Sequence, residues 1–143
     1  LNRNDETLHA TLEKMGQILG FLFQRSDDLL DYNIRNDEGK VILGDLKSGY
    51  LNSFGAFVAQ GLDAGKRADL VRSQNLEEFK ANLGGGAAFD EKVKQFDQVN
   101  QKQIELYHQL LEDLRSRLQP EERLLAEELR PLTDLLYWRK SSK

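Results

Sequence analysis

Residues 23–32 read FQRSDDLLDY, and the spacing of the acids in this stretch decides how the chain is interpreted. Asp27 and Asp31 are four residues apart, so on an α-helix their carboxylates share one face, with Gln24 one turn earlier on that face. Asp28 is rotated by about 100° around the same helix. Apolar residues stand between the acids and give the helix a side that can be buried. The stretch predicts the end of an amphipathic helix that carries a row of acidic side chains.

The residues before this stretch extend the same helix toward the N-terminus. Apolar side chains recur every three or four positions, which predicts one helix over about residues 7–32. Gly16 and Gly20 stand one turn apart inside it, although each weakens a helix by ~1 kcal/mol relative to alanine. A glycine pair at this spacing predicts that another helix packs closely against it. The residues expected on the buried face are Leu8, Leu12, Met15, Leu19, Phe23 and Leu30.

The middle of the chain is typical of short helices joined by polar turns. Residues 33–44 are rich in turn-forming side chains and interrupt the helical pattern. Further on, three consecutive glycines at positions 84–86 indicate a flexible loop. Between these two interruptions, helices are expected over residues 46–62, 64–73 and 76–83.

Two more helices are expected toward the C-terminus. Asp90 can cap a long helix that runs to Leu118. Pro120 suits the first position of the next helix, and Pro131 is expected to kink it, because the ring removes a donor and clashes with the preceding turn. No segment alternates with period two for long, so the predicted fold class is all-α, a helical bundle that forms a single domain over residues 1–143. The buried face of the last helix is expected to consist of Leu125, Leu129, Leu132 and Leu136.

The bulk composition restricts the classes of protein that fit. The chain has 143 residues, 39% hydrophobic and 31% charged, with a formal net charge of -4 and no cysteine. These values are typical of a folded globular protein without disulfides or thiolate metal sites. No long apolar run is present and no basic stripe stands out, so neither a membrane span nor a nucleic-acid partner is expected. The lack of cysteine fits a reducing compartment, and we expect a cytoplasmic location.

The like charges of Asp27 and Asp31 repel each other at this spacing, so something must offset them. A divalent cation would do so, and the negative end of the helix dipole also favours a cation there. Magnesium takes one or two protein carboxylates and fills its other positions with water and phosphate oxygens. Lys40 follows in the next loop and can hold a diphosphate as a point charge. An acidic helix end also occurs as an ordinary solvated face, so on these residues alone both interpretations stand.

A longer pattern around the acids resembles a known family. Residues 16–31 combine a glycine pair with Phe-Gln-x-x-Asp-Asp-x-x-Asp, which is similar to the second aspartate-rich motif of the trans-isoprenyl diphosphate synthases, the polyprenyl synthase family. That family continues with Gly-Lys and then with Asp-Leu-x-x-Gly, and residues 137–140 also look like its C-terminus. The chain therefore resembles the C-terminal half of such a synthase. The matching residues after the motif are Gly39, Lys40, Asp45, Leu46 and Gly49.

The resemblance implies the isoprenoid-synthase fold and a prenyltransferase of isoprenoid biosynthesis. A complete member condenses an allylic diphosphate with isopentenyl diphosphate and uses magnesium. Carried over to this sequence, Asp27, Asp28 and Asp31 are the catalytic acids, and Asp27 and Asp31 are the magnesium ligands. Gln24 and Lys40 contact the substrate, Lys40 through the diphosphate. The family also implies a homodimer.

The sequence departs from the family pattern at several positions. Tyr50 stands where a second lysine is usual, and Asn52 stands where threonine is usual. Binding of diphosphate by this loop is therefore expected to be weaker or rearranged. Lys47 is near enough in sequence to compensate for the missing second lysine. No first aspartate-rich motif precedes Gly16, and Leu1 is not methionine, so we expect a fragment or one piece of a split enzyme. Alone, the chain is expected to be inactive, and to pair with its missing N-terminal half or with a second copy.

Two other interpretations stay open on the sequence. One is a non-catalytic helical subunit of a heteromeric prenyl synthase, because Tyr50 departs from the family at a diphosphate-binding position. The other is a helical scaffold without a diphosphate site. Asp27 and Asp31 beside Gln24 and Lys40 in one cavity would exclude the scaffold, whereas acids that face solvent apart from one another would favour it. Product length is not predicted, because the residues that set it in this family lie near the first motif.

Overall fold

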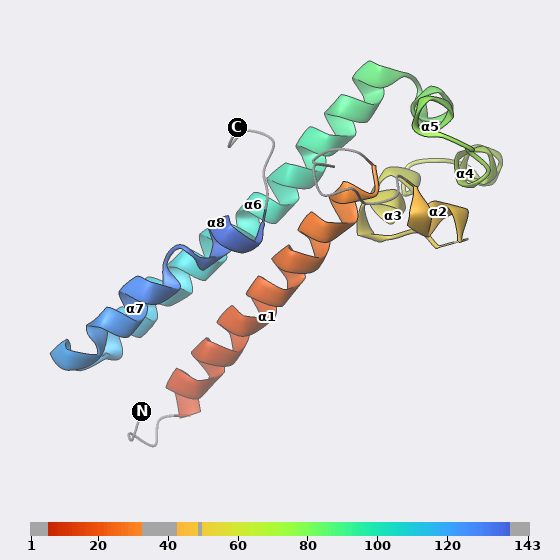
Figure 1. Cartoon of the computed structure of the whole chain (residues 1–143). Helices are drawn as coiled ribbons and strands as arrows, with labels where there is room; N and C mark the ends of the chain where they lie inside the picture. The colour runs from red at the N-terminus through yellow and green to blue at the C-terminus, as the bar shows by residue number, and fades with distance from the viewer. Residues whose placement is uncertain (1–5, 33–42, 49, 138–143) are drawn as a thin grey trace. The chain divides into compact units, whose positions relative to one another are not determined.

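The computed structural model describes residues 6–32, 43–48 and 50–137 (Figure 1). Within these ranges the regular structure is helical and contains no strand, so the all-α prediction is confirmed. None of the helices in the described ranges is long and apolar enough to cross a membrane. In chain order the helices are α1 (Glu6–Leu30), α2 (Gly44–Lys47), α3 (Ser53–Ala59), α4 (Ala64–Val71), α5 (Leu76–Leu83), α6 (Gly86–Arg117), the 3-10 turn η1 (Pro120–Glu122), α7 (Arg123–Leu129) and α8 (Leu132–Leu136).

The chain divides into two compact units, and the two longest helices each contribute to both. Unit 1 combines Leu1–Gln24 with Asn100–Trp138, and unit 2 combines Arg25–Val99 with Arg139–Lys143. The last turns of α1 and the first half of α6 therefore belong to unit 2, and the remaining parts of both helices belong to unit 1. The acids of the FQRSDDLLDY stretch, residues 27–31, all fall in unit 2.

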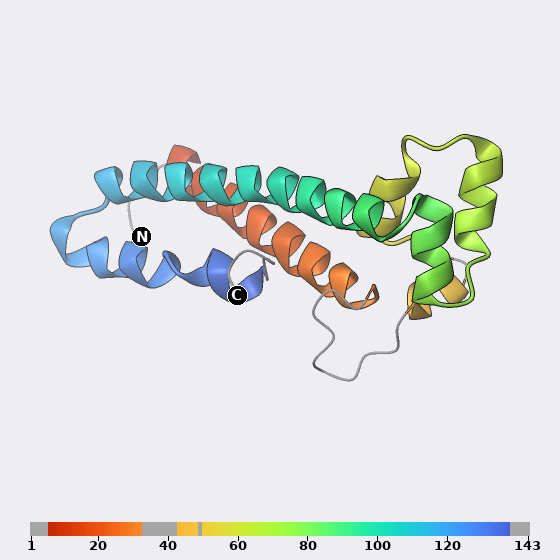
Figure 2. The same ribbon diagram turned by 90° about the horizontal axis from the view of Figure 1, so that it is seen from above.

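In unit 1, α7 and α8 turn back along the second half of α6 (Figure 2). Two buried tyrosines fasten the returning chain. The Tyr107 hydroxyl of α6 donates to the Leu129 carbonyl at 2.7 Å, and the Asn100 amide donates to the Tyr137 hydroxyl at 2.8 Å. Burial raises the pKa of the Tyr107 phenol, so it stays a donor at neutral pH. These bonds hold the end of α7 and the residue after α8 against α6.

The two prolines act where the sequence predicted, but the buried face of the last helices is different. Pro120 opens η1, and α7 ends before Pro131, after which α8 begins. The predicted face is wrong by one position: Leu125 is 40% exposed, and Ala126 and Thr133 are buried in its place. Both sets have helical spacing, but Leu124 and Leu135 are 69% and 74% exposed, so the leucines of this segment do not mark its buried side. The hydrophobic pattern alone therefore did not fix the rotation of the helix.

In unit 2 the core is built on aromatic rings. The Tyr32 ring centroid lies 5.0 Å from that of Phe54 and 4.9 Å from that of Phe79. Phe54 also packs on Phe96 at 5.3 Å, so rings from the residues that follow α1 and from α3, α5 and α6 meet in one cluster. Edge-to-face and tilted pairs of this kind contribute ~0.5–1.5 kcal/mol each beyond their burial. The cluster holds the end of α1 close to α3.

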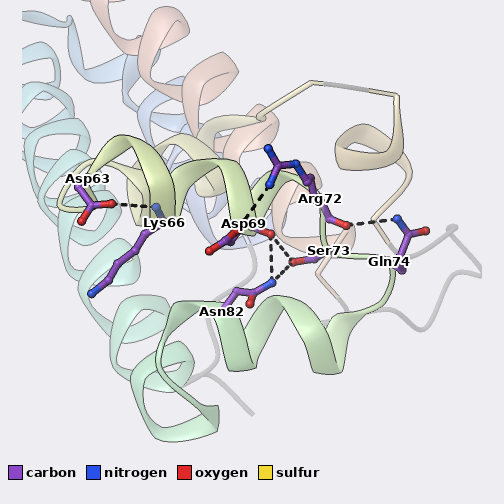
Figure 3. Close-up of polar contacts among 7 residues, drawn as sticks. All are labelled: Asp63, Lys66, Asp69, Arg72, Ser73, Gln74 and Asn82. Atoms are coloured by element: carbon purple, nitrogen blue, oxygen red, sulfur yellow. Dashed lines mark hydrogen bonds and ion pairs between the residues drawn. The ribbon is translucent and has the colours of Figure 1, made fainter.

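The α4–α5 hairpin is fixed by polar side chains at its turn (Figure 3). Asp63 caps α4 by accepting from the Lys66 backbone N–H at 2.8 Å. The Asn82 amide of α5 donates to the Asp69 carbonyl and to the Ser73 hydroxyl, at 3.0 Å each, and so joins the two helices. The bounds of α4 and α5 agree with the two short helices predicted here.

Two predicted boundaries and the predicted buried face of the first helix need correction. The long C-terminal helix begins at Gly86 rather than at Asp90, because Gly84 and Gly85 adopt positive φ angles of 126° and 113° and reverse the chain early. The predicted helix over 46–62 is divided into α2 and α3. On α1, Phe23 is 56% exposed, and the buried apolar residues are Leu8, Met15, Ile18, Leu22 and Leu29.

The glycine pair of α1 does not meet a closely packed helix in the part of the chain that the structure describes. A β-carbon built on Gly16 or on Gly20 would have no atom within 4 Å, apart from its own helix neighbourhood. The predicted tight contact is therefore absent among the described residues. The glycines lie on an exposed face of α1.

Candidate functional site

Asp31 lies just beyond the end of α1 and caps the start of α2. Its side chain is 0% exposed. The Gly44 N–H donates to Asp31 Oδ1 at 2.7 Å, and the Asp45 N–H donates to Asp31 Oδ2 at 3.2 Å. These are the first two N–H groups of α2, which have no partner inside the helix. Leu43, the residue before α2, has no polar side chain to cap it, so Asp31 supplies the cap from thirteen positions upstream.

Asp31 also holds a strained residue. Leu43 adopts a left-handed conformation with φ 62°, which costs a branched side chain roughly 1–2 kcal/mol. The Leu43 N–H donates to the Asp31 carbonyl at 2.6 Å, and the Leu43 side chain is fully buried. The backbone and the side chain of Asp31 together return the chain to the end of α1 at this point.

Asp28 caps the start of α3, as Asp31 caps the start of α2. It is almost fully buried, and its Oδ2 accepts from the Ser53 N–H at 3.0 Å and from the Ser53 hydroxyl at 2.7 Å. Ser53 is the first residue of α3. A carboxylate that accepts backbone N–H groups at a helix N-terminus forms charge-assisted bonds and favours the positive end of the helix dipole. The two buried acids are thus stabilised by the helices that they cap.

Asn52 joins the three segments around these acids. Its Oδ1 accepts from the Gly55 N–H at 3.0 Å, as the local cap of α3. Its Nδ2 donates to the Asp28 carbonyl and to Asp45 Oδ2, both at 3.1 Å. Asn52 is 1% exposed. One buried amide therefore contacts the end of α1, the side chain of an α2 residue and the start of α3.

Tyr32 completes the site on its apolar side. It is 1% exposed, and its hydroxyl has no hydrogen-bond partner among the residues that the structure describes. Burial raises the pKa of the Tyr32 phenol far above its ordinary value, and the neighbouring carboxylates of Asp31, Asp45 and Asp28 raise that pKa further. The phenol therefore stays neutral, and three carboxylates contribute to the negative potential around it.

The predicted site residues differ in their access to solvent. Asp28 and Asp31 are buried, whereas Asp27 is partly exposed and Gln24 is exposed on α1. Lys40 lies outside the described residues. Asp31 lies one residue beyond the end of α1 and is fully buried, whereas Asp27 is partly exposed, so these two predicted ligands differ in their access to solvent. The structure brings Asp31 close to Asp45 and places both near Asp28 around the Tyr32 side chain, and the burial of Asp28 and Asp31 means that the acids do not all face solvent.

Asn52 and Ser53, which organise the site, are not among the predicted site residues. Asn52 and Ser53 directly precede an apolar run, which is an N-cap signature for α3. The signal was present, but a helix predicted over 46–62 placed both residues in its interior. Asp45 was noticed only through the family resemblance. Its contacts with Asp31 and Asn52 depend on residues distant in sequence.

Within the described ranges, no three or more acidic or histidine side chains are grouped in a way that would hold a metal ion. Asp27 and Asp45 are the acids of this region that are not fully buried. Searches against protein-family models, curated proteins and solved structures found no match to this chain. The resemblance to the prenyl synthases is therefore one of sequence pattern between Gly16 and Gly49.

Proposed function

We propose that this chain is the magnesium- and diphosphate-binding C-terminal part of an isoprenyl diphosphate synthase. One observation supports this most directly. The two stretches that resemble the family, residues 16–31 and 39–49, are joined by the hydrogen bonds of Asp31 to Gly44 and Asp45. Residues that a family motif places in one site are expected to be held together in space. The isoprenoid-synthase fold belongs to the same proposal.

The residues around the end of α1 fit magnesium in the type of atom that they offer. Carboxylate oxygens are the ligands that magnesium prefers, and it needs only one or two from the protein. Asp27 supplies the accessible carboxylate, and Asp31 and Asp28 hold the starts of α2 and α3 at the end of α1. When bound, magnesium would stabilise the negative charge of a departing diphosphate. Gln24 orients the ligand, and Lys40 contributes a positive charge to it.

In the proposed reaction of the complete enzyme, an allylic diphosphate loses diphosphate to give an allylic cation. The double bond of isopentenyl diphosphate attacks that cation, and a proton is then lost. The side chains of this chain contribute binding and electrostatic stabilisation rather than covalent chemistry. The chain alone is proposed to be inactive, because no first aspartate-rich motif is present in it.

The first test is binding of inorganic diphosphate to the full chain, measured by calorimetry with and without magnesium. The proposal expects binding that requires magnesium, and expects Asp27→Asn to weaken it about tenfold or more, as the loss of a metal ligand or its support usually does. Glu13→Gln is the matched control, since it removes one exposed charge from the same helix far from the acids. Equal affinities for both variants, or no binding at millimolar concentrations, would refute the proposal.

The proposal includes association with the N-terminal half or with a second copy. Exposed Phe23 supports it, because it lies on the same face of α1 as the open Gly16 and Gly20, three and seven residues earlier, and this face is not covered by other described residues. Sedimentation at increasing concentration tests association directly. A strictly monomeric chain that binds no hydrophobic dye would contradict it.

A second candidate is a non-catalytic subunit of a heteromeric prenyl synthase. Its support is the complete burial of Asp31, whose two carboxylate oxygens both accept backbone N–H groups. Acids used in this way stabilise a fold without any metal. Retention of partner binding by a chain that binds no magnesium diphosphate would favour this candidate.

A further inference from the structure

Asn52 makes a set of contacts that the usual threonine could not make. An amide has two N–H donors and one carbonyl acceptor, whereas a hydroxyl has one donor. Both ends of the Asn52 amide are used, with Nδ2 contacting Asp28 and Asp45 and Oδ1 contacting Gly55. Threonine at this position can cap α3, but cannot also donate to both acceptors. The departure from the family pattern therefore adds hydrogen bonds at this junction.

The contact with Asp45 has a consequence for α2. That helix has only four residues, so it is not stable alone and depends on its surroundings. The Asp31 carboxylate accepts hydrogen bonds from the backbone N–H groups of Gly44 and Asp45 in α2. Asn52 donates a hydrogen bond to the Asp45 side chain of the same helix. Lys47 and the partly exposed Asp45 both lie on α2. The orientation of these charged side chains depends on how firmly α2 is held.

We propose that Asn52 is a positioning residue, which orients α2 and its charged side chains against the end of α1. The statement that this orientation serves a magnesium diphosphate rests on the proposed function. The positioning itself does not, because it follows from hydrogen bonds between described residues. Asn52 does not touch the ligand in this scheme and acts through Asp45.

The chain offers a matched pair of variants for the test. Asn52→Thr keeps a side chain able to cap α3 and removes the donors to Asp45 and Asp28. Asn75→Thr makes the same change at the cap of α5, where Asn75 accepts from the Glu78 N–H at 2.9 Å. A third variant, Asp45→Ala, breaks the same link from its other end and leaves the α3 cap intact, so it serves if Asn52→Thr does not fold.

The first measurement is amide hydrogen exchange by NMR. Loss of the Asn52–Asp45 bond should speed exchange at the Gly44 and Asp45 amides about fivefold, as expected for one net hydrogen bond. Asn75→Thr should change exchange only at the start of α5. If Asn52→Thr accelerates exchange only in α3, or leaves Gly44 and Asp45 unchanged, then Asn52 is merely a cap and the inference is wrong.

The second measurement is magnesium-dependent binding of inorganic diphosphate by the same folded variants. Asn52→Thr should weaken it several-fold, and Asn75→Thr should leave it unchanged. If the unmodified chain binds no diphosphate, the proposed function fails, and the exchange result alone decides the positioning role. If exchange accelerates while diphosphate affinity stays normal, Asn52 positions α2 but not the ligand site, and that half of the inference is overturned.

Discussion

The hydroxyl oxygen of Tyr32 lies directly against the backbone of Gly55. A β-carbon built on Gly55 would be 2.6 Å from that oxygen and 3.1 Å from a methyl carbon of Leu51. The Tyr32 ring has little freedom to move, because it packs on Phe54 and Phe79. Glycine is thus required at this position for space, and the contact sets how closely α3 approaches the end of α1.

Gly55→Ala should lower the free energy of unfolding by about 1–3 kcal/mol, the usual cost of an added carbon in a packed region. Tyr32→Phe should be neutral or slightly stabilising, because its buried hydroxyl has no partner among the described residues. In the double variant, the cost of alanine should fall, since the nearest clashing atom is gone. Urea unfolding of the four proteins measures this coupling. Strict additivity would mean that Leu51 or the backbone causes the strain.

The three acids of the motif should differ in their effect on stability. Asp31→Ala leaves two backbone N–H groups at the start of α2 without their acceptor. Asp28→Ala leaves the Ser53 backbone N–H at the start of α3 without its acceptor. Each should cost about 1–3 kcal/mol. Asp27→Ala, at a partly exposed position, should cost less than either of these variants. Urea unfolding checks the order, and an Asp27 variant as unstable as the Asp31 variant would contradict it.

This difference affects how activity data on the motif should be interpreted. Lost binding in an Asp28 or Asp31 variant would follow from disordered α2 or α3 as readily as from a lost ligand. Asp27 is the position where binding can be tested with little disturbance of the fold. For this reason the test of the proposed function uses Asp27→Asn.

Local signals predicted some helices well and left others uncertain. The helix over 76–83 was located correctly because Asn75 caps its start and Gly84 ends it. The phase of α1 was only partly right, because apolar residues at Ile18 and Leu22 compete with Leu19 and Phe23 for the buried face. Helix length and caps depend on near neighbours, but rotation depends on what the helix packs against.

The arrangement of the acids could not be predicted from helical spacing. That reasoning assumed that the helix continues through Asp31, whereas α1 stops one residue earlier. The groups that then bind Asp31 and Asp28 are backbone N–H groups thirteen and twenty-five positions away. Backbone donors carry no signature in the sequence, so only the fold shows that these acids are caps.

The surface ion pair between Glu112 of α6 and Arg130, the residue after α7, should make the free energy of unfolding depend on pH in the acid range. The Arg130 guanidinium donates to Glu112 at 2.9 Å and holds the pKa of that carboxyl below its ordinary value of 4.5. A lowered pKa in the folded state means that the contribution is present above pH ~4.5 and is lost as the pH falls through the folded value. Arg130→Gln should remove the contribution of this ion pair to the loss of stability at low pH.

Thermal unfolding of that variant between pH 3 and pH 7 provides the measurement. Both side chains are well exposed, so the effect at pH 7 should be small. Arg72→Gln is the control, because its exposed pair with Asp69 has a longer separation of 3.6 Å within one helical turn. The same pH profile for the Arg130 and Arg72 variants would show that the Glu112 pair contributes nothing measurable.

Tyr50 offers a test of the family resemblance that leaves the fold undisturbed. Its side chain is 60% exposed, and its N–H donates to the Asp45 carbonyl, a bond that any residue but proline can make. Tyr50→Lys restores the residue usual in the family. It should strengthen magnesium-dependent binding of diphosphate up to about fivefold, since an exposed charge pair contributes ~0.2–1 kcal/mol.

The gain should have the properties of an electrostatic contact. It should shrink as the salt concentration rises, because exposed charges are screened over ~10 Å at 0.1 M ionic strength. Tyr50→Gln is the matched control, since it removes the ring without adding charge, and it should leave affinity unchanged. Lys47→Gln should weaken binding if that lysine compensates for the missing one. If Tyr50→Lys gains no more than Tyr50→Gln, then this loop does not face a diphosphate, and the family pattern is no guide to the ligand of this chain.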